Sequence, residues 1–325
     1  MPPAAPVAPR VAEVTKQFGA AVESARLDLP LPGRGRTLER WRALLDLAAE
    51  DLCVARLAEA HLDALAILAE LQGPPAPAGS RWGVWAAHPP SPSLVARPDG
   101  ASWLLDGTKP WCSGARACTH ALVTADAPDG YRLFAVDLTG ARPVPGTWHA
   151  VGMAGSDSLD VEFAGVAAQP VGGPGAYLDR PGFWHGAMAV AAVWHGGAVG
   201  VARALLDTAS RRPLGPHALA HLGAVDAALS AVTVALEVAA AQVDADPEDA
   251  AGGARLTAQR LRAQTERTAT EVLDRVGRAL GAGPLCRDAR HAALTADLPV
   301  YLRQSHAEAD LAGLGVLVLE RGPHW

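Results

Sequence analysis

Residues 105–114 read LDGTKPWCSG, a strand-like run that contains the turn pair DG at 106–107. Around it, between residues 81 and 169, lie the further short apolar runs WGVWAA, SLVAR, HALVTA, YRLFAVDL and LDVEF. Turn signals separate them: PDG at 98–100 and at 128–130, and TG at 139–140. Short strands at this spacing, with turn residues between them, are typical of a sandwich or barrel. The central part of the chain is therefore expected to form a small all-β domain.

Helical periodicity marks the sequence on both sides of this central part. In front of it, residues 38–72 carry leucines at spacings of three, four and their sums, which predicts one long amphipathic helix with Thr37 as its N-cap. Residues 1 to about 10 are expected to form a frayed arm. Behind the central part, long helices are expected near 183–210, 217–243, 254–281 and 289–313. Four long helices with short connections predict a bundle.

The order of these elements predicts an α+β multidomain fold of three consecutive parts. We expect a helical segment at residues 1–79, reduced to one long helix, a middle β-barrel at 80–172 and a C-terminal four-helix bundle at 173–325. The Gly/Pro-rich stretches GPPAPAGS at 73–80 and VGGPGAYLDRPG at 171–182 mark the two boundaries.

The composition excludes several classes of protein. Of the 325 residues 50% are hydrophobic and 19% are charged, which does not fit an intrinsically disordered chain. The formal net charge of −6 lacks the basic excess of nucleic-acid-binding domains, so no nucleic-acid partner is expected. Four scattered cysteines are too few for a disulfide framework, and the first residues lack the apolar core of a signal peptide. We therefore expect a cytoplasmic protein.

One segment also allows a membrane interpretation. Residues 181–202 run for 22 positions without Asp, Glu, Lys or Arg, which is long enough to cross a bilayer. The same segment holds two histidines, several glycines and few large aliphatic side chains. A helix that is apolar on every side is equally suited to the core of a large helical domain. We expect a core helix and no membrane partner.

Common catalytic fingerprints are missing from the sequence. It has no P-loop, no G-x-G-x-x-G between a strand and a helix, and no G-x-S-x-G. Cys112 and Cys118 have no second pair, and His217 and His221, spaced i and i+4, have no third ligand. We interpret the two histidines as helix-packing or surface residues and expect no metal site.

Several strings, in this order, resemble the acyl-CoA dehydrogenase family of flavoproteins. Residues 105–114 look like the family's L-x-G-x-K-x-W-I-T-N strand, and VGMAGSDSLDVEF at 151–163 is similar to the segment that closes its barrel. Further similar strings are RRPLG at 211–215, RALGAG at 278–283 and RDAR at 287–290. The resemblance runs from about residue 81 to residue 310. It implies a helical domain, a β-barrel and a four-helix bundle, with FAD bound between barrel and bundle and a neighbouring subunit assisting.

The resemblance also implies which residues contact the FAD. Six of them match cofactor positions of the family: Ser93, Trp111, Ser113, Arg211, Gly281 and Gly283. Trp111 would lie against the flavin ring and Ser113 would reach its N5 atom. Arg211 would bind the pyrophosphate across a dimer, and the two glycines would let the backbone approach the cofactor. The structural alternatives are an ordinary barrel tryptophan with a solvated serine, a charged bundle rim, and a helix C-cap at Gly281.

The catalytic base of the family has no direct counterpart here. Dehydrogenation of a thioester removes the proton next to the carbonyl, and a positioned carboxylate is the expected base. By the resemblance this position falls on Ala296, and the position used by some relatives falls near Ala191 and Ala192. Asp297 and His195 are therefore the catalytic candidates, although a shift of one residue on a helix rotates a side chain by about 100°. A buried, hydrogen-bonded histidine is the alternative for His195.

A polar cluster near the C-terminus allows two interpretations. Arg303, His306 and Asp310 are spaced three and four apart and would share one face of the helix expected at 289–313. They form either a functional constellation or a salt-bridged capping face, and we favour the second.

Together these features predict an FAD-dependent oxidoreductase that forms a homodimer or homotetramer. The resemblance implies oxidation of a CH–CH bond in an acyl thioester or a related small substrate. A flavin-dependent monooxygenase of the same fold is the alternative, because its oxygen chemistry does not need the carboxylate base. A fold relative without catalysis, acting as a binding partner, is the third interpretation.

Overall fold

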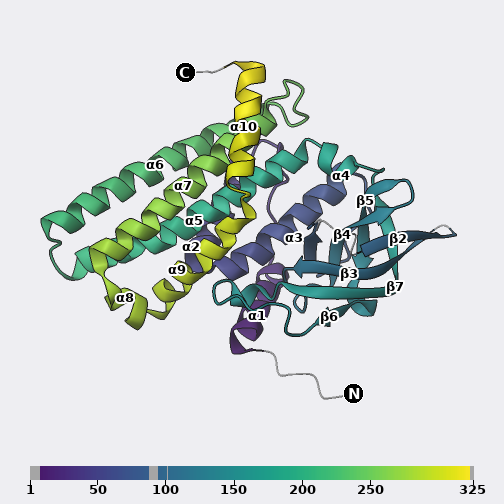
Figure 1. The fold of residues 1–325 in the computed structure, drawn as a ribbon, viewed down its shortest axis with the longest axis horizontal. Helices are drawn as coiled ribbons and strands as arrows, with labels where there is room; N and C mark the ends of the chain where they lie inside the picture. The colour runs from purple at the N-terminus through teal and green to yellow at the C-terminus, as the bar shows by residue number, and fades with distance from the viewer. Residues whose placement is uncertain (1–7, 88–93, 101, 323–325) are drawn as a thin grey trace. The chain divides into compact units, whose positions relative to one another are not determined.

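The computed structural model describes residues 8–87, 94–100 and 102–322 (Figure 1). Its contacts group the chain into two compact units. The barrel unit comprises residues 1–29, 56–150 and 154–183, and the helical unit comprises residues 30–55, 151–153 and 184–325. Neither unit is one continuous stretch of chain, because the helical unit takes residues 30–55 from the N-terminal part. The three consecutive domains 1–79, 80–172 and 173–325 stay a prediction.

The barrel unit contains one seven-stranded sheet. Its strands are β1 (Trp82–Trp85), β2 (Leu94–Asp99), β3 (Ser102–Cys112), β4 (His120–Ala127), β5 (Gly130–Asp137), β6 (Arg142–Val144) and β7 (Leu159–Val171). Six of the strands follow the order β1-β4-β2-β3-β7-β5, β6 pairs with β7 beside this path, and an additional β4–β5 pairing closes the ring. The expected β-barrel and its six strand-like runs are confirmed. The sequence pattern missed β6 because it is only three residues long and contains a proline.

Alternation along the strands divides the barrel's apolar residues between its two faces. Inside the ring, Leu105, Phe134 and Val161 are among the buried residues of the main core cluster. A second cluster lies on the outer face, where Ile67 of helix α3 (Leu52–Glu70) packs with Leu122 of β4. Strand β4 is buried on both of its faces, one inside the barrel and one against α3. Successive side chains at residues 121–123 are therefore all apolar, which explains the continuous apolar run in its sequence.

The N-terminal part forms three helices. Two of them lie where one long helix was expected over 38–72, so the prediction of a single helix is wrong. The helices are α1 (Pro9–Glu23), α2 (Thr37–Glu50) and α3 (Leu52–Glu70). Asp51 separates the last two: its backbone is extended, and its carboxylate accepts hydrogen bonds from the N–H groups of Cys53 and Val54. An aspartate that caps a new helix interrupts the apolar period very little. The arm expected at residues 1 to about 10 lies outside the described residues as far as residue 7. Helix α1 begins at Pro9, and its Val14 and Phe18 are fully buried.

The start of α2 is capped by a side chain from a distant part of the sequence. Thr37 was expected to be the N-cap, but it is the first helical residue and Arg36 precedes it. Asp244 accepts hydrogen bonds from the Thr37 N–H (3.0 Å) and from the Thr37 hydroxyl (2.6 Å). The negative carboxylate satisfies a free N–H group at the positive end of the helix.

The helical unit consists mainly of long helices. They are α5 (Gly182–Arg211), α6 (Pro216–Ala245), α7 (Ala254–Leu280), the short α8 (Ala282–Arg287), α9 (Ala289–Tyr301) and α10 (Glu308–Arg321), while the short α4 (Ala176–Asp179) belongs to the barrel unit. The helices expected near 183–210, 217–243 and 254–281 are confirmed. Figure 1 shows α6 and α7 running side by side along their length.

The fourth expected helix, over 289–313, is wrong because the chain breaks between α9 and α10. Pro299 lies within α9, where it removes a backbone donor, and Ala307 adopts a left-handed φ of 47°. Arg303 therefore does not share a helix face with His306 and Asp310. Asp310 instead accepts a hydrogen bond from the His306 N–H at 3.0 Å, which confirms the capping interpretation for this pair.

The glycines of α5 allow close contact with α2 within the helical unit. A Cβ on Gly196 would lie 2.3 Å from the carbonyl oxygen of Leu45, and one on Gly200 would lie 2.7 Å from that of Ala49. Both α5 and α6 are long and apolar enough for a membrane span, but the apolar window of α5 is 72% buried by protein against 28% for α6. The helix over 181–202 is therefore a core helix, as expected, and the exposed apolar helix is α6.

Candidate functional site

The end of β3 displays an exposed tryptophan. A register shift between Lys109 and Cys112 marks a bulge in the pairing of β3 with β7. Within it Trp111 takes a left-handed φ of 55°, and its side chain is 61% exposed while Cys112 is fully buried. Bulges re-aim side chains, and a non-glycine residue in the left-handed region is uncommon. An exposed indole held in this way points to a binding role.

Ser113, two residues further on, ends a row of three buried hydroxyl groups. Its Oγ lies 2.8 Å from Oγ of Ser158, which lies 2.8 Å from Oγ of Ser156. Each hydroxyl can donate one hydrogen and accept others. When Ser156 donates to Ser158 and Ser158 donates to Ser113, the hydrogen of Ser113 is left for a ligand. When the direction reverses, Ser113 accepts from a ligand instead.

The backbone around Ser113 is fixed from two sides. The Trp85 indole N–H donates to the Ser113 carbonyl at 3.0 Å, and the Gly114 N–H donates to the Ser156 carbonyl at 2.7 Å. Arg116 forms a bidentate ion pair with the buried Asp157, with contacts of 2.8 and 2.5 Å. Two fork-like contacts to a buried carboxylate give both strength and direction. The pair of Trp111 and Ser113 is therefore presented by a rigid support.

A buried lysine lies inside the same strand. The Lys109 ammonium donates to the carbonyl (2.6 Å) and to the hydroxyl (2.8 Å) of Thr124. Thr124 is paired with Leu133 of β5, so the ammonium is anchored to a residue in the middle of the sheet. Burial lowers the pKa of Lys109 to about 8. We interpret Lys109 as a structural residue that links β3 to β4 within the barrel.

The other residues expected to contact the cofactor lie in the helical unit or outside the described residues. Arg211 is exposed at the last turn of α5. Gly281 takes a φ of 65° and donates its N–H to the Gly277 carbonyl, which is the C-cap interpretation considered above. Gly283 lies in α8, and a Cβ at either glycine would meet nothing within 4 Å. Ser93 lies outside the described residues.

Asp297 is buried and already engaged by neighbouring groups of the helical unit. Its carboxylate accepts a hydrogen bond from the Met153 N–H and lies 3.6 Å from the Cys53 thiol. Next to Met153, a Cβ on Gly152 would overlap the carbonyl of Ala296, which shows how closely residues 151–153 pack on α9. This geometry favours a carboxylate that fixes a segment of backbone. A role of Asp297 as catalytic base stays a prediction.

His195 is enclosed between α5 and α6. Its Nε2 lies 3.0 Å from the Thr233 hydroxyl, which itself donates to the Leu229 carbonyl, so Nε2 carries the proton. Nδ1 has no hydrogen-bond partner among the described residues, and the residue is 1% exposed. Burial lowers the pKa of His195 to about 4. The geometry favours a neutral helix-packing histidine, and its role in catalysis stays a prediction.

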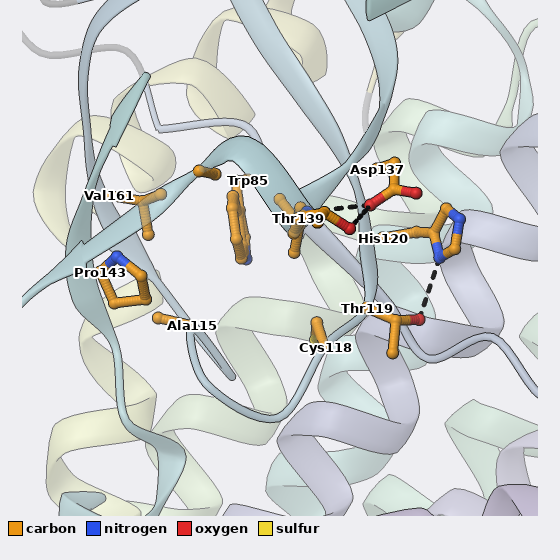
Figure 2. Close-up of a pocket in the computed structure, with 11 residues that line it drawn as sticks. Trp85, Ala115, Cys118, Thr119, His120, Asp137, Thr139, Pro143 and Val161 are labelled. Carbon is orange, nitrogen blue, oxygen red and sulfur yellow. Dashed lines mark hydrogen bonds between the residues drawn. The ribbon is translucent and has the colours of Figure 1, made fainter. Parts of the chain in front are cut away.

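A cavity of about 320 Å³ opens at one end of the barrel. Figure 2 shows the indole of Trp85 near Val161 and Pro143 on one side of it, and Asp137 and His120 on the other. His120 and Asp137 are directly opposite each other where β4 and β5 pair. No sequence motif marks this cavity, because its lining residues come from four separate segments of the chain.

The row formed by Ser113, Ser158 and Ser156 was also not predicted from the sequence. The string GSDS at 155–158 carries both serines, but it is not a strand: Ala154–Ser156 form a 3-10 turn and Asp157 has a φ of 47°. Strand alternation therefore gave no signal for this row. Ser113 lies 45 positions away from Ser158, and no local pattern joins them.

Comparison with solved structures identifies the fold. KijD3, solved in complex with FMN and dTDP-3-amino-2,3,6-trideoxy-4-keto-3-methyl-D-glucose, matches with a TM-score of 0.79 at 19% identity, over 98% of this chain and 95% of that chain. Methanesulfinate monooxygenase MsuC from Pseudomonas fluorescens matches with a TM-score of 0.78 at 19% identity, over 98% of both chains. The chain has the acyl-CoA dehydrogenase-like fold.

A third solved structure extends this group. FMN-bound TdsC, a dibenzothiophene monooxygenase from Paenibacillus sp. A11-2, matches with a TM-score of 0.75 at 20% identity, over 97% of both chains. No protein-family model and no curated protein matches the sequence. The acyl-CoA dehydrogenase-like fold is therefore established by structure, and at these identities the likeness carries the fold alone.

Proposed function

We propose that this protein is a flavin-dependent oxidoreductase and that the Trp111–Ser113 edge of its barrel binds the flavin ring. The observation that carries this proposal is the pairing of an exposed, conformationally strained Trp111 with a serine hydroxyl that can donate or accept. KijD3 and TdsC, which share the fold, were each solved with FMN. A flavin is either FMN or FAD, and the experiment below separates them.

The residues at this edge fit a flavin ring. The ring is flat and partly apolar, and its N5 and carbonyl edges need hydrogen-bond partners. The indole of Trp111 offers an aromatic surface of matching chemistry. N5 accepts a hydrogen bond in the oxidised ring and donates one in the reduced ring, so a reversible row such as Ser113, Ser158 and Ser156 suits both states. The flavin supplies the electron transfer when bound.

Monooxygenation fits the described residues better than CH–CH dehydrogenation. The two positions where a carboxylate base is expected hold Ala296 and the fully buried pair Ala191 and Ala192. Asp297 is engaged by Met153. In the proposed reaction, reduced flavin, dioxygen and substrate give oxidised flavin, water and a substrate that carries one new oxygen atom. No proton next to a carbonyl has to be removed, and the electrons come from a reductant that reduces the flavin.

The reaction is tested with the purified protein, reduced flavin and isotopically labelled dioxygen. The first probes are methanesulfinate and dibenzothiophene, the compounds named for the monooxygenases that share the fold. We expect the product of an accepted sulfur compound of this kind to carry one labelled oxygen atom. Bleaching of the oxidised flavin by acyl-CoA thioesters in the absence of oxygen would instead establish a dehydrogenase.

We further propose that α6 packs against a second copy of this chain. Leu219, Val234 and Val238 are each more than half exposed, and Asp226 and Glu237 are the two charged residues between 216 and 243. A two-fold axis brings a surface against itself, so an apolar face suits self-association better than a charged one. Light scattering should show a dimer or larger assembly, and Val234→Glu should dissociate it. A monomeric wild type, or a need for detergent, would contradict this.

A further inference from the structure

We propose that the ion pair between Arg116 and Asp157 positions the serine row, formed by Ser113, Ser158 and Ser156, so that Ser113 can accept a hydrogen bond from reduced flavin. The inference rests on the proposed function, because the row ends at the barrel edge assigned to the flavin ring. Arg116 and Asp157 act on the flavin through the serines, so they are positioning residues. All of these residues lie within the barrel unit.

Residues 113–116 and residues 156–158 are joined at every position of the first segment. At the far end from Ser113, Nε and Nη2 of Arg116 donate to the two carboxylate oxygens of Asp157 at 2.8 and 2.5 Å. The other contacts are Ser113 Oγ to Ser158 Oγ (2.8 Å), the Gly114 N–H to the Ser156 carbonyl (2.7 Å) and the Ala115 N–H to the Asp157 carbonyl (3.3 Å). The ion pair therefore completes a set of contacts that fixes the second segment against the first.

The backbone of Asp157 needs this support. Its φ of 47° lies in the left-handed region, which is unfavourable for a residue with a Cβ. Asp157 also stands between Ser156 and Ser158, so its conformation decides whether the two flanking hydroxyls meet, as they do at 2.8 Å. Its side chain is 4% exposed, and a buried carboxylate needs a counter-charge. The Arg116 guanidinium supplies that charge and fixes the direction of the carboxylate at the same time.

The position of Ser158 matters more for reduced flavin than for oxidised flavin. Toward the oxidised ring Ser113 donates its hydrogen to N5, so that hydrogen is satisfied by the ligand. Toward the reduced ring Ser113 accepts from N5–H, and its own hydrogen then needs another acceptor. The Ser158 hydroxyl, 2.8 Å away, is that acceptor, and both serines are buried. If Ser158 moves away, a buried hydrogen is left without a partner only in the complex with reduced flavin, which weakens that complex.

The inference is tested by titrating FMN and FAD, each oxidised and anaerobically reduced, into the full-length wild type and Arg116→Gln. We expect the affinity for reduced flavin to fall about tenfold and that for oxidised flavin to fall less than about threefold. The ratio of the two affinities sets the reduction potential of bound flavin, which a mere loss of stability does not change. Arg97→Gln is the control, because it breaks a more exposed ion pair with Asp106 in the same barrel and should change neither affinity.

A second substitution should rescue the first. Glycine adopts a positive φ without strain and carries no buried charge, so Arg116→Gln/Asp157→Gly should regain the reduced-flavin affinity lost in Arg116→Gln. If Arg116→Gln does not fold, Asp157→Gly and Asp157→Ala decide the question, because only the alanine should lose reduced-flavin binding. An unchanged affinity ratio in Arg116→Gln, or equal behaviour of the glycine and alanine variants, would overturn this inference alone. A wild type that binds no flavin would overturn the proposed function itself.

Discussion

The hydroxyl oxygens of Ser113 and Ser158 lie 2.8 Å apart, although 45 positions separate the two residues in the sequence. The contact joins the end of β3 to the segment that leads into β7, and Ser156 extends it by a second contact of 2.8 Å. A hydroxyl row can reverse its direction at no cost in heavy-atom positions. Ser113 is thereby equipped to donate to one state of a ligand and to accept from another.

This relationship predicts separate effects for the two serines. Ser113→Ala removes the proposed contact to the flavin and should weaken flavin binding about fivefold to tenfold, the usual effect of one hydrogen bond. Ser158→Ala keeps the Ser113 contact to the flavin but removes the hydroxyl that joins Ser113 to Ser156. Ser113 can then no longer switch between donor and acceptor through that row, so the flavin reduction potential should shift more than the flavin affinity. Fluorescence titration and potentiometry measure the two effects. Ser102→Ala, at the exposed start of β3, is the control, and equal behaviour of all three variants would contradict the account.

Asp297 is predicted to act through structure. Its carboxylate accepts from the buried Met153 N–H, so Asp297→Ala should lower the free energy of unfolding by about 1–3 kcal/mol by leaving that donor without a partner. Asp297→Asn keeps an acceptor of the same shape and should retain most of the stability. Chemical denaturation gives both values.

The same two variants separate this role from catalysis. An asparagine cannot accept a proton as a general base does. If Asp297→Asn is as stable as the wild type but loses turnover entirely, Asp297 is the base and the structural interpretation fails. We expect turnover in Asp297→Asn to follow stability.

Gly196 is predicted to be essential for packing within the helical unit. A Cβ there would lie 2.3 Å from the Leu45 carbonyl oxygen, so Gly196→Ala forces the α2 and α5 backbones apart and should destabilise the protein by about 1–3 kcal/mol. Gly223 on α6 has nothing within 4 Å of a built Cβ, so Gly223→Ala should instead stabilise by up to about 1 kcal/mol. Thermal unfolding of both variants checks the sign. A neutral Gly196→Ala would show that α2 and α5 do not pack this closely.

The buried His195 predicts a loss of stability in acid. Burial lowers its pKa from 6.5 to about 4, so the unfolded chain binds a proton at a higher pH than the folded one. The stabilising contribution is complete above pH 6.5 and is lost as the pH falls through about 4. His195→Gln should therefore show a shallower decline over this window than the wild type, by a difference on the order of 3 kcal/mol. His217→Gln, at an exposed position, should decline like the wild type.

The sequence predicted the barrel and the long helices well, because each has a strong local signal. The runs around β4 and β5 are bounded by Gly and Pro turns, and α5, α6 and α7 have lengths that no strand reaches. It failed where a single residue interrupts a periodic pattern. Asp51 caps α3 without changing the spacing of the apolar residues. Ala307 takes a positive φ between α9 and α10, although alanine is a good helix former and its presence does not predict a helix break.

The candidate site likewise has features that the sequence predicts and features that only the structure shows. Trp111 and Ser113 could be predicted as flavin contacts because the motif that contains them is continuous in sequence, and this assignment stays a prediction. The engagement of Asp297 by Met153, the row through Ser158 and the cavity beside Asp137 depend on segments that folding brings together. A contact between distant segments leaves no local pattern, so these features required the structure.

A flavin titration of the purified protein tests the proposed Trp111–Ser113 flavin site. FMN and FAD, each oxidised and reduced, are added separately to the wild type and to Trp111→Ala, and binding is followed by flavin absorbance and fluorescence. We predict saturable binding of at least one flavin, with one flavin per chain, and weaker binding to Trp111→Ala because the exposed indole is lost. Failure of the wild type to bind either flavin in either state, or binding that Trp111→Ala leaves unchanged, would contradict the proposed site.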